Sequence, residues 1–310
     1  YLDHKSEEKA KKPIGTTKRG IGPAYQDRVS RVGLKLYQYV CPSLSKKWLE
    51  NMCYGSEEFS HYYQKNPEVW EAFFSASHKL LPLVTDVEQK LRYEITEGSK
   101  ELFLEGAQGV LLDINHGTYP YVTSSSTIAS AAASSIGFDP RLINKIYGVA
   151  KAYVTRVGEG CFPTEDAGEG GELLGKKGHE FGATTNRKRR CGWFDAVAMR
   201  YAQVINGFGS VLLNKLDILS GFKSIKVATS YVSERGDKVD NFPTHFRPED
   251  NLKPVYEEFE GWAEDISSVK SFSALPQATQ TYIRGLEHLS NIKIGFIGNG
   301  PNKENYISCS

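Results

Sequence analysis

Short apolar segments that each run into a polar loop recur along the second half of this 310-residue chain, and they constrain its fold most. Val211–Leu213 runs into Asn-Lys-Leu-Asp, and Ile292–Ile297 runs into Gly-Asn-Gly-Pro. Predicted helices over Phe194–Ile205 and Pro276–Leu289 alternate with such strands. This alternation is typical of a largely parallel sheet, whose ligand sites lie at the carboxyl ends of the strands. We therefore expect an α/β fold.

The amino-terminal third of the chain has a mostly helical pattern, across Val32–Val40 and again across Leu49–Gly98. Residues 1–13 are charged and end in proline, so we expect a linker or an insert there. We expect residues 14–310 to form one large α/β domain. Within it, Leu102–Leu104 is predicted to be a short buried strand.

The charge balance of the chain disfavours two classes of partner, although it leaves room for a local basic site. There are 38 Lys and Arg residues against 37 Asp and Glu residues, a formal net charge of +1. Such a balance argues against bulk electrostatic binding to nucleic acid or to an anionic membrane.

No apolar run approaches the ~18 residues needed to span a bilayer. Five widely spaced cysteines without a Cys-x-x-Cys pair fit reduced thiols. We expect a cytoplasmic protein with no nucleic-acid or membrane partner.

Asn214 to Asp217 read Asn-Lys-Leu-Asp directly after a predicted strand. In GTP-binding proteins a motif of this form selects guanine. The aspartate carboxylate accepts from two N–H groups on the Watson–Crick edge of the base, and the lysine stem lies along the base. Adenine leaves the carboxylate unsatisfied, which is costly. A helix-capping or surface aspartate is the alternative, but the position at a strand end favours a guanine site.

A glycine-rich, charged segment over residues 158–192 contains few aliphatic residues and is expected to be a long functional loop. It carries Arg187-Lys-Arg-Arg, preceded by Thr184 and Thr185. Arginine gives bidentate hydrogen bonds to phosphate and carboxylate, and threonine hydroxyls add donors. A solvated basic turn or a nucleic-acid patch is the alternative. The near-neutral net charge disfavours nucleic acid, so we favour an anion-binding loop.

Three other segments contain residues that suit phosphate or ligand contact. In Glu-Gly-Ala-Gln-Gly, residues 105–109, the glycines allow a close approach to a ligand and Gln108 can both donate and accept; a strand bulge is the alternative. Thr123 and the three serines after it precede a predicted helix over residues 127–136, where they would cap the helix or hold a phosphate at its N-terminus. Gly170–Lys177 has phosphate-loop-like spacing, but it lacks the magnesium-binding hydroxyl and a preceding strand, so we reject it.

Six blocks of this sequence together resemble adenylosuccinate synthetase. They are IGTTKRGIGPAY, LEGAQGVLLDINHGTYPYVTSSS, GVAKAYVTRVGEGCFPTE, GATTNRKRRCGWFDAVAMRY, LNKLDIL and LPQATQTYIRGLEHL. The resemblance covers nearly all of residues 14–307, with the family's spacing between blocks. It implies a P-loop-NTPase-like α/β fold, with a large, mostly parallel sheet flanked by helices.

The resemblance also implies a reaction in AMP biosynthesis. GTP phosphorylates the 6-oxygen of IMP, and L-aspartate then displaces that phosphate to give adenylosuccinate, GDP and phosphate, with Mg²⁺ required. Members of the family are homodimers. The partners expected from the resemblance are therefore IMP, GTP, L-aspartate and a second copy of the chain.

Carried over residue by residue, the resemblance implies roles for the motifs described above. Gln108 resembles the glutamine beside the reacting purine, which binds IMP and helps to stabilise charge on its 6-oxygen. The other positions similar to IMP ligands are Thr17, Thr123, Arg187 and Arg31, the last reaching across the dimer to the partner's IMP. The aspartate-binding loop corresponds to Ala183, Thr184, Thr185, Asn186, Arg187, Lys188 and Arg189. The GTP-binding positions correspond to Arg189, Lys215, Leu216, Asp217, Gly298, Asn299 and Gly300.

The sequence departs from the family pattern in two places. Family members begin with a phosphate loop of the form Gly-Asp-Glu-Gly-Lys-Gly-Lys, whose aspartate is the catalytic base and a magnesium ligand, and a nearby Gly-His supplies the catalytic acid. Neither precedes the first block here. We expect the magnesium ligands mainly in that amino-terminal section and none in this chain. At Gly298 the family more often has a Ser-Thr-Gly-Pro type of sequence.

Two other function classes are alternatives to an active ligase. A catalytically incomplete nucleotide-binding fragment would keep the IMP, aspartate and guanine surface. A GTPase-like switch would use Asn-Lys-Leu-Asp alone, and the lack of a phosphate loop in the sequence disfavours it.

Overall fold

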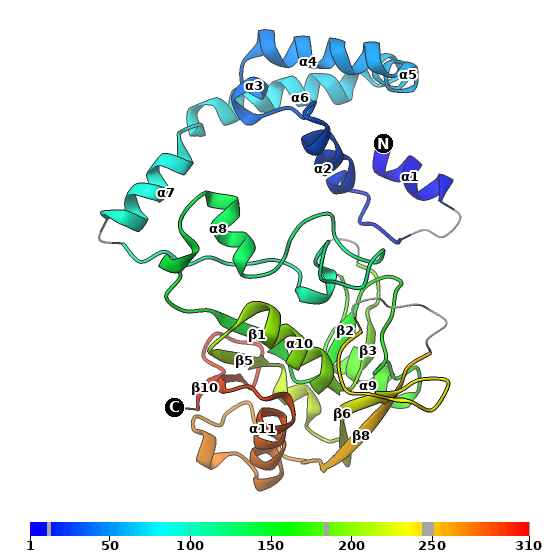
Figure 1. Cartoon of the computed structure of the whole chain (residues 1–310), viewed down its shortest axis with the longest axis vertical. Coiled ribbons are helices and arrows are strands. Elements are labelled where there is room, and N and C mark those ends of the chain that lie inside the picture. Colours follow the sequence, from blue (N-terminus) through cyan, green and yellow to red (C-terminus); the bar gives the residue numbers. More distant parts are fainter. Residues whose placement is uncertain (11–13, 99, 183–185, 244–250, 310) are drawn as a thin grey trace. The chain divides into compact units, whose positions relative to one another are not determined.

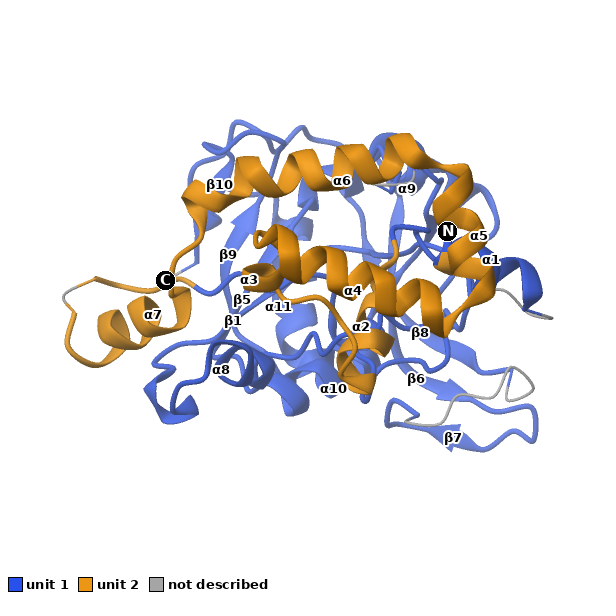
Figure 2. Ribbon diagram, turned by 90° about the horizontal axis from the view of Figure 1, so that it is seen from above, with its two compact units in different colours: residues 1, 3–19, 104–310 blue, residues 2, 20–103 orange. Residues whose placement is uncertain are grey.

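The computed structural model describes residues 1–310 except 11–13, 99, 183–185, 244–250 and 310. Contacts within it define two compact units (Figure 2). Unit 1 comprises residues 1, 3–19 and 104–310, and unit 2 comprises residues 2 and 20–103. Among the described residues, no helix has both the length and the apolar character that a membrane crossing requires.

Unit 1 contains a four-stranded sheet of order β1-β5-β9-β10, of which Figure 1 labels β1, β5 and β10 and Figure 2 also labels β9. Strands β1 (Tyr147–Lys151), β5 (Ser210–Asn214) and β9 (Ile294–Gly298) pair in parallel. Strand β10 (Tyr306–Ser308) pairs antiparallel with β9. In the register of this sheet Lys151 lies opposite Asn214. The carboxyl ends of the three parallel strands therefore meet at one edge, where ligand sites of α/β sheets form.

The remaining strands of unit 1 form two smaller groups. In one, β6 (Ser224–Val232) pairs in parallel with β4 (Phe194–Asp195) and antiparallel with β7 (Lys238–Val239) and β8 (Lys253–Glu260). In the other, β2 (Val154–Arg156) and β3 (Arg190–Gly192) form an antiparallel pair. This pairing places β2, the strand that follows β1, beside Arg190 at the end of the basic cluster.

The helices of unit 1 begin and end at residues with clear local causes. In α10 (Ala196–Asn206) the Asp195 side chain accepts from the backbone N–H of Ala198, and the left-handed Gly207 follows the last turn. In α11 (Gln277–Ser290) the buried residues recur at helical spacing, with Tyr282, Ile283 and Leu286 in the main core. The other helical segments are α1 (Leu2–Lys9), α8 (Ser130–Ile136), α9 (Glu169–Lys177), η2 (Val110–Leu112), η3 (Pro140–Leu142), η4 (Leu216–Leu219) and η6 (Phe272–Ala274).

Unit 2 is built from helices. They are α2 (Ile21–Ser30), α3 (Leu36–Tyr39), α4 (Pro42–Gly55), α5 (Glu57–Lys65), α6 (Pro67–Leu80), η1 (Leu81–Leu83) and α7 (Val87–Thr96). Prolines open α4 and α6 at the first turn, where a missing N–H costs nothing. The ring of Trp70 packs edge-on against Phe59 and Phe73, with centroids 5.6 and 5.7 Å apart. Aromatic packing thus joins α5 to α6.

The α/β class with a mostly parallel main sheet is confirmed. The strands predicted before Asn-Lys-Leu-Asp and before Gly298 are β5 and β9, and the helices predicted over Phe194–Ile205 and Pro276–Leu289 are α10 and α11. The domain boundaries at residues 13 and 14 stay predictions.

Two local predictions are wrong. Leu102–Leu104 forms no strand, and Phe103 is 86% exposed. The segment 158–192 is no continuous loop, because it contains α9 and β3. The glycines of this segment are typical of a loop, but here they allow a helix to pack closely against its neighbours. A Cβ at Gly171 would lie 1.8 Å from the carbonyl oxygen of Asp166, so only glycine allows this packing. Gly170–Lys177, which we rejected as a phosphate loop, lies within this helix.

Candidate active site at the carboxyl edge of the parallel sheet

The guanine-type motif lies where strand β5 ends. The backbone carbonyl of Asn214 accepts from Ala152, and Lys215 adopts a left-handed φ of 62° that starts η4. The ammonium of Lys215 donates to the carbonyl of Gly178 at 2.6 Å and lies 3.1 Å from Oε1 of Glu180. Both ends of the lysine side chain are therefore fixed, and its stem is held at the sheet edge.

The carboxylate of Asp217 is half-buried, and burial raises its pKa. Nearby Lys215 and Lys177 act in the opposite direction. Apart from its own backbone N–H, no group in the described part of the chain donates a hydrogen bond to this side chain. Its oxygens can therefore accept from a ligand, as the guanine motif requires.

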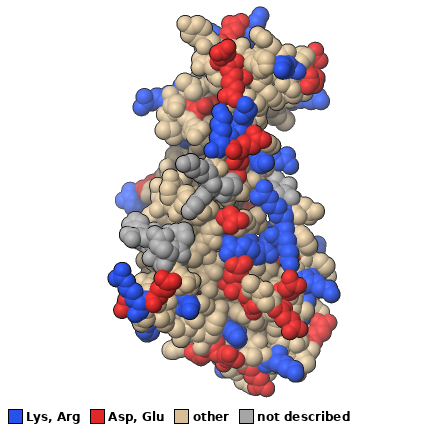
Figure 3. All heavy atoms as spheres, turned by 90° about the vertical axis from the view of Figure 1, so that its right-hand side faces the viewer, with Lys and Arg blue, Asp and Glu red and all other residues tan. Residues whose placement is uncertain are grey.

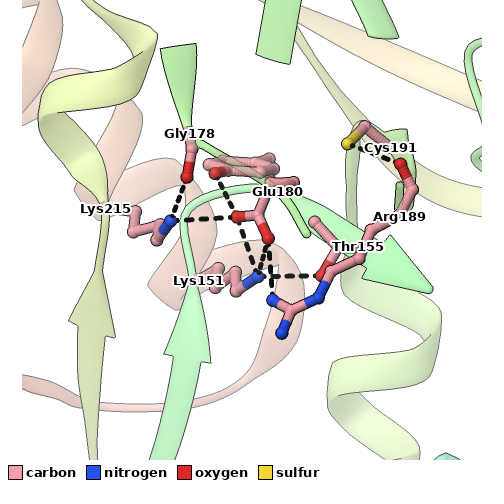
Figure 4. A network of polar contacts seen from close by, with 8 residues as sticks. Lys151, Thr155, Gly178, Glu180, Arg189, Cys191 and Lys215 are labelled. Carbon is pink, nitrogen blue, oxygen red and sulfur yellow. Dashed lines mark hydrogen bonds and ion pairs between the residues drawn. The ribbon is translucent and has the colours of Figure 1, made fainter. Parts of the chain in front are cut away.

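A buried carboxylate, Glu180, lies at the centre of a cluster that the sequence alone did not reveal (Figure 4). The Glu180 side chain is 1% exposed and meets three cations. Lys151 donates to both its oxygens at 2.9 and 2.8 Å, and Arg189 donates to Oε2 at 2.8 Å. Figure 4 shows Lys151, Arg189 and Lys215 all pointing toward this carboxylate. Residues from β1, from the basic cluster and from the guanine-type motif therefore converge on one group.

Opposing influences set the ionisation of this cluster. Burial is the largest and favours the protonated form of Glu180, but hydrogen bonds from Lys151 and Tyr153, together with the charge of Lys151 and a contact from Lys215, outweigh it. The result lowers the pKa of Glu180 to about 2. Burial also lowers the pKa of Lys151, against the opposing effect of Glu180, and raises the pKa of Tyr153. Glu180 is therefore a stable anion that holds cations.

The basic cluster divides into arginines with different partners. Arg190 binds Glu165 and the carbonyls of Gly158 and Gly160, so it stabilises the loop. Arg189 holds Glu180 through one terminal nitrogen, and its buried Nε has no partner among the described residues. The Arg189 side chain as a whole is 26% exposed, so a ligand would meet the accessible part of this side chain and not the buried Nε.

Arg187 is exposed and donates to the backbone carbonyls of Gly15 and Thr16 at 3.1 and 3.5 Å. The structure thus brings the predicted IMP residues Thr17 and Arg187 into neighbouring segments. Asn186 has a left-handed φ of 51°, and Lys188 pairs with Glu172 at the surface. Ala183, Thr184 and Thr185 lie outside the described residues.

The segment around Gln108 and Thr123 is organised by another residue that sequence reasoning missed. Asp113 is fully buried and accepts from the backbone of Asn115, His116 and Thr127 and from the hydroxyl of Ser126, at 2.6–3.0 Å. Burial opposes ionisation, yet these bonds lower the pKa of Asp113. Gln108 is exposed and has a left-handed φ of 63°, a conformation that is often retained at functional positions.

The end of β9 approaches the guanine-type motif closely. A Cβ at Gly298 would lie 2.5 Å from Oδ1 of Asn214, so glycine permits this approach. Asn299 is buried and donates to the carbonyls of Ile266 and Val269 at 2.6 and 3.0 Å, which anchors the segment they belong to. Gly300 follows in the same loop. Arg31 ends α2 of unit 2, where it is exposed with a left-handed φ of 65°.

On the face drawn in Figure 3, positively and negatively charged side chains are mixed. Lys and Arg side chains lie beside Asp and Glu side chains over that face. This distribution agrees with the net charge of +1.

Comparisons with known proteins agree with one another. The family model described as adenylosuccinate synthetase matches residues 1–307. The adenylosuccinate synthetase of Photobacterium profundum is 46% identical over 304 residues, which is 96% of this chain and 70% of that protein. That of Trichlorobacter lovleyi is 44% identical over 302 residues, 94% of this chain and 69% of that protein. A structure of fully ligated adenylosuccinate synthetase from Plasmodium falciparum superimposes with a TM-score of 0.93 at 35% identity, covering 100% of this chain and 74% of that one.

Proposed function

This chain belongs to the adenylosuccinate synthetase family, and from that premise we propose which of its residues serve each step of the reaction. The activity is that of a GTP-dependent ligase that forms a carbon–nitrogen bond. The γ-phosphoryl group of GTP is transferred to the 6-oxygen of IMP, and the amino group of L-aspartate then displaces that phosphate. The match over residues 1–307 supports the ligase rather than an incomplete binding fragment or a GTPase-like switch.

The observation that carries the residue assignments is the meeting of Arg189 and Lys215 on Glu180. It joins the end of the aspartate-type loop to the guanine-type motif within one unit. Catalysis requires that the loops binding GTP and aspartate keep a fixed geometry relative to IMP, and a shared carboxylate holds these two loops together.

Guanine is bound at the ends of β5 and β9. Asp217 accepts from the two N–H groups of the base, and the fixed stem of Lys215 lies along its face. The backbone of Leu216, whose side chain is buried in the main core, and the loop Gly298, Asn299 and Gly300 complete the site. Asn299 acts there through the backbone position that it holds, because its Nδ2 is already bound to Ile266 and Val269 and its side chain is buried.

IMP and aspartate are bound by the loops around the basic cluster. Thr17 and Thr123 bind the IMP phosphate, and Arg187 contacts its ribose. The loop Ala183, Thr184, Thr185, Asn186 and Lys188 holds aspartate, together with the guanidinium groups of Arg187 and Arg189. Arg189 also approaches GTP, since its partly exposed side chain carries a positive charge beside the guanine-type motif.

Catalysis by these residues consists mainly of positioning and charge stabilisation, as phosphoryl transfer requires. Gln108 donates its amide hydrogen toward the 6-oxygen of IMP as negative charge grows there. Arg189 balances the charge of the phosphate and of the aspartate carboxylates. In the second step the aspartate nitrogen forms the new bond to carbon 6, and the 6-oxygen leaves with the phosphate.

Magnesium is the cofactor of the family. Mg²⁺ usually binds through one or two carboxylates, substrate phosphates and water. No three His, Cys, Asp or Glu side chains gather to hold a metal among the residues that the structure describes. These residues do not fit an all-protein magnesium cage. We propose that its protein ligands belong mainly to the family's amino-terminal phosphate-loop section.

We also propose that the enzyme is a cytoplasmic homodimer in which Arg31 reaches the partner's IMP. The exposure of Arg31 at the end of α2 supports that role, because an exposed guanidinium is free to meet a ligand bound elsewhere.

The function is tested by incubating the protein with IMP, GTP, L-aspartate and Mg²⁺ and following adenylosuccinate by its ultraviolet absorbance. We expect product only when all three substrates are present, with one GDP and one phosphate for each adenylosuccinate. Replacement of GTP by ATP should abolish turnover. GTP hydrolysis that requires neither IMP nor aspartate would overturn the ligase in favour of a switch.

A further inference from the structure

We infer that Glu180 is a positioning residue that couples the guanine-reading Lys215 to the aspartate-binding Arg189. The inference rests on the proposed function of those two residues and extends it, because Glu180 belongs to neither motif. It explains how two loops that are distant in sequence keep one geometry.

The two oxygens of Glu180 serve different partners. Oε1 receives the hydroxyl of Tyr153 at 2.6 Å and lies 3.1 Å from the Lys215 ammonium. Oε2 receives Arg189 at 2.8 Å. Lys151 bridges both oxygens and also donates to Thr155 at 2.8 Å. Because the carboxylate is planar and held from both sides, its orientation sets the positions of Lys215 and Arg189 together.

The backbone around Glu180 ties it to the same two loops. Its N–H donates to Gly175 at the end of α9, and its carbonyl accepts from the N–H of Arg189 at 2.9 Å. The carbonyl of Gly178, two residues away, receives Lys215. Glu180 therefore contacts the arginine through main chain and side chain, and the lysine through its side chain and a near neighbour.

Loss of the carboxylate would release both ligand-binding side chains. Lys151, Lys215 and Arg189 would remain as three neighbouring cations that repel one another without a common anion. Of its hydrogen-bond and ion-pair partners among the described residues, Lys215 would keep only the Gly178 carbonyl, so its stem could leave the plane where the base lies. Arg189 would lose the side-chain hydrogen bond that fixes the orientation of its guanidinium group.

The side-chain contacts that hold the IMP residues do not involve the Glu180 carboxylate, although Arg187 lies in the same hairpin as Glu180. Arg187 is held by the carbonyls of Gly15 and Thr16, and Asp113 organises the segment around Thr123. Neither arrangement includes Glu180. Coupling through Glu180 therefore predicts a change in GTP and aspartate binding with no change in IMP binding, whereas a general loss of structure would weaken all three.

The decisive experiment compares Glu180→Gln with Glu258→Gln in steady-state turnover. Glu258 is an exposed β8 carboxylate near Lys226, and it provides the same chemical change away from the site. For Glu180→Gln we expect the KM values for GTP and aspartate to rise roughly tenfold each, the size of one lost charge-assisted hydrogen bond. The KM for IMP should stay within about twofold of the wild-type value, and Glu258→Gln should match the wild type.

Two results would overturn the inference: unchanged KM values for GTP and aspartate, or an equal rise for all three substrates. If Glu180→Gln does not fold, Glu180→Asp keeps the charge but is one methylene shorter, so it cannot reach Arg189 and Lys215 together. The same split in KM is expected, and its absence would count against the coupling. Failure of the proposed function can be told apart from failure of the coupling through Glu180, because the wild-type protein would then make no adenylosuccinate.

Discussion

The phenol of Tyr153 donates to Oε1 of Glu180 at 2.6 Å, and both side chains are buried. Tyr153 follows strand β1, whereas Glu180 follows α9. The bond thus links the main sheet to the segment that carries the basic cluster. Together with Lys151 it keeps Glu180 ionised, and this has a consequence for stability.

Glu180 should make the fold sensitive to acid. Its pKa falls from an ordinary value of 4.5 to about 2 in the folded chain. Its ionised form therefore stabilises the fold fully above about pH 4.5, and this contribution is lost as the pH falls toward 2. Urea unfolding at a series of pH values should show that Glu180→Gln lacks this part of the acid dependence, whereas Glu258→Gln retains it. Identical pH profiles for Glu180→Gln and the wild type would contradict the assignment.

Asp217→Asn should change which nucleotide the enzyme uses. The amide cannot accept from both N–H groups of guanine and places its own donor against one of them. We expect the KM for GTP to rise roughly 10- to 100-fold, as the loss of hydrogen bonds to a charged group predicts. Xanthosine triphosphate has a carbonyl in place of the guanine amino group and should bind the variant better than the wild type. Steady-state kinetics with both nucleotides measures this, with IMP as the internal control. An unaltered KM for GTP would remove Asp217 from the guanine site.

Gly285→Ala should destabilise unit 1 although alanine favours helices. A Cβ at this position of α11 would lie 2.3 Å from Cε1 of Phe259 on β8. Overpacking of this kind costs about 1–3 kcal/mol, which exceeds the gain of about 1 kcal/mol in helix propensity. Gly55→Ala at the end of α4 is the matched control, because nothing lies within 4 Å of its Cβ position. Thermal unfolding should show a lower Tm for Gly285→Ala only, and a raised Tm for it would refute the packing described.

The sequence predicted those parts of the fold and site that depend on neighbouring residues. Strand β5 and the motif after it are contiguous, so local apolar pattern and spacing suffice. The strand predicted at Leu102–Leu104 failed because an apolar triplet does not reveal whether a partner strand lies beside it. Helix α9 was missed because its glycines resemble a loop until the close contact with Asp166 is known.

Glu180 and Asp113 could not have been found in the same way. Each is a single acidic residue whose role arises from partners brought to it by the fold, and Glu180 receives Lys151 and Lys215 from 29 and 35 residues away in the sequence. The one available signal was an acidic residue beside a basic cluster, which is common at protein surfaces. Motif reasoning identified side chains that face a ligand, whereas these two residues hold such side chains in place.

The most direct test of the proposed chemistry is the fate of the 6-oxygen of IMP. The protein is given IMP labelled with oxygen-18 at position 6, together with GTP, L-aspartate and Mg²⁺, and the released phosphate is analysed by mass spectrometry. If GTP phosphorylates that oxygen before aspartate displaces it, every phosphate formed with adenylosuccinate carries one labelled oxygen. Unlabelled phosphate, with the label released into water, would show that the 6-oxygen is never phosphorylated and would contradict the account.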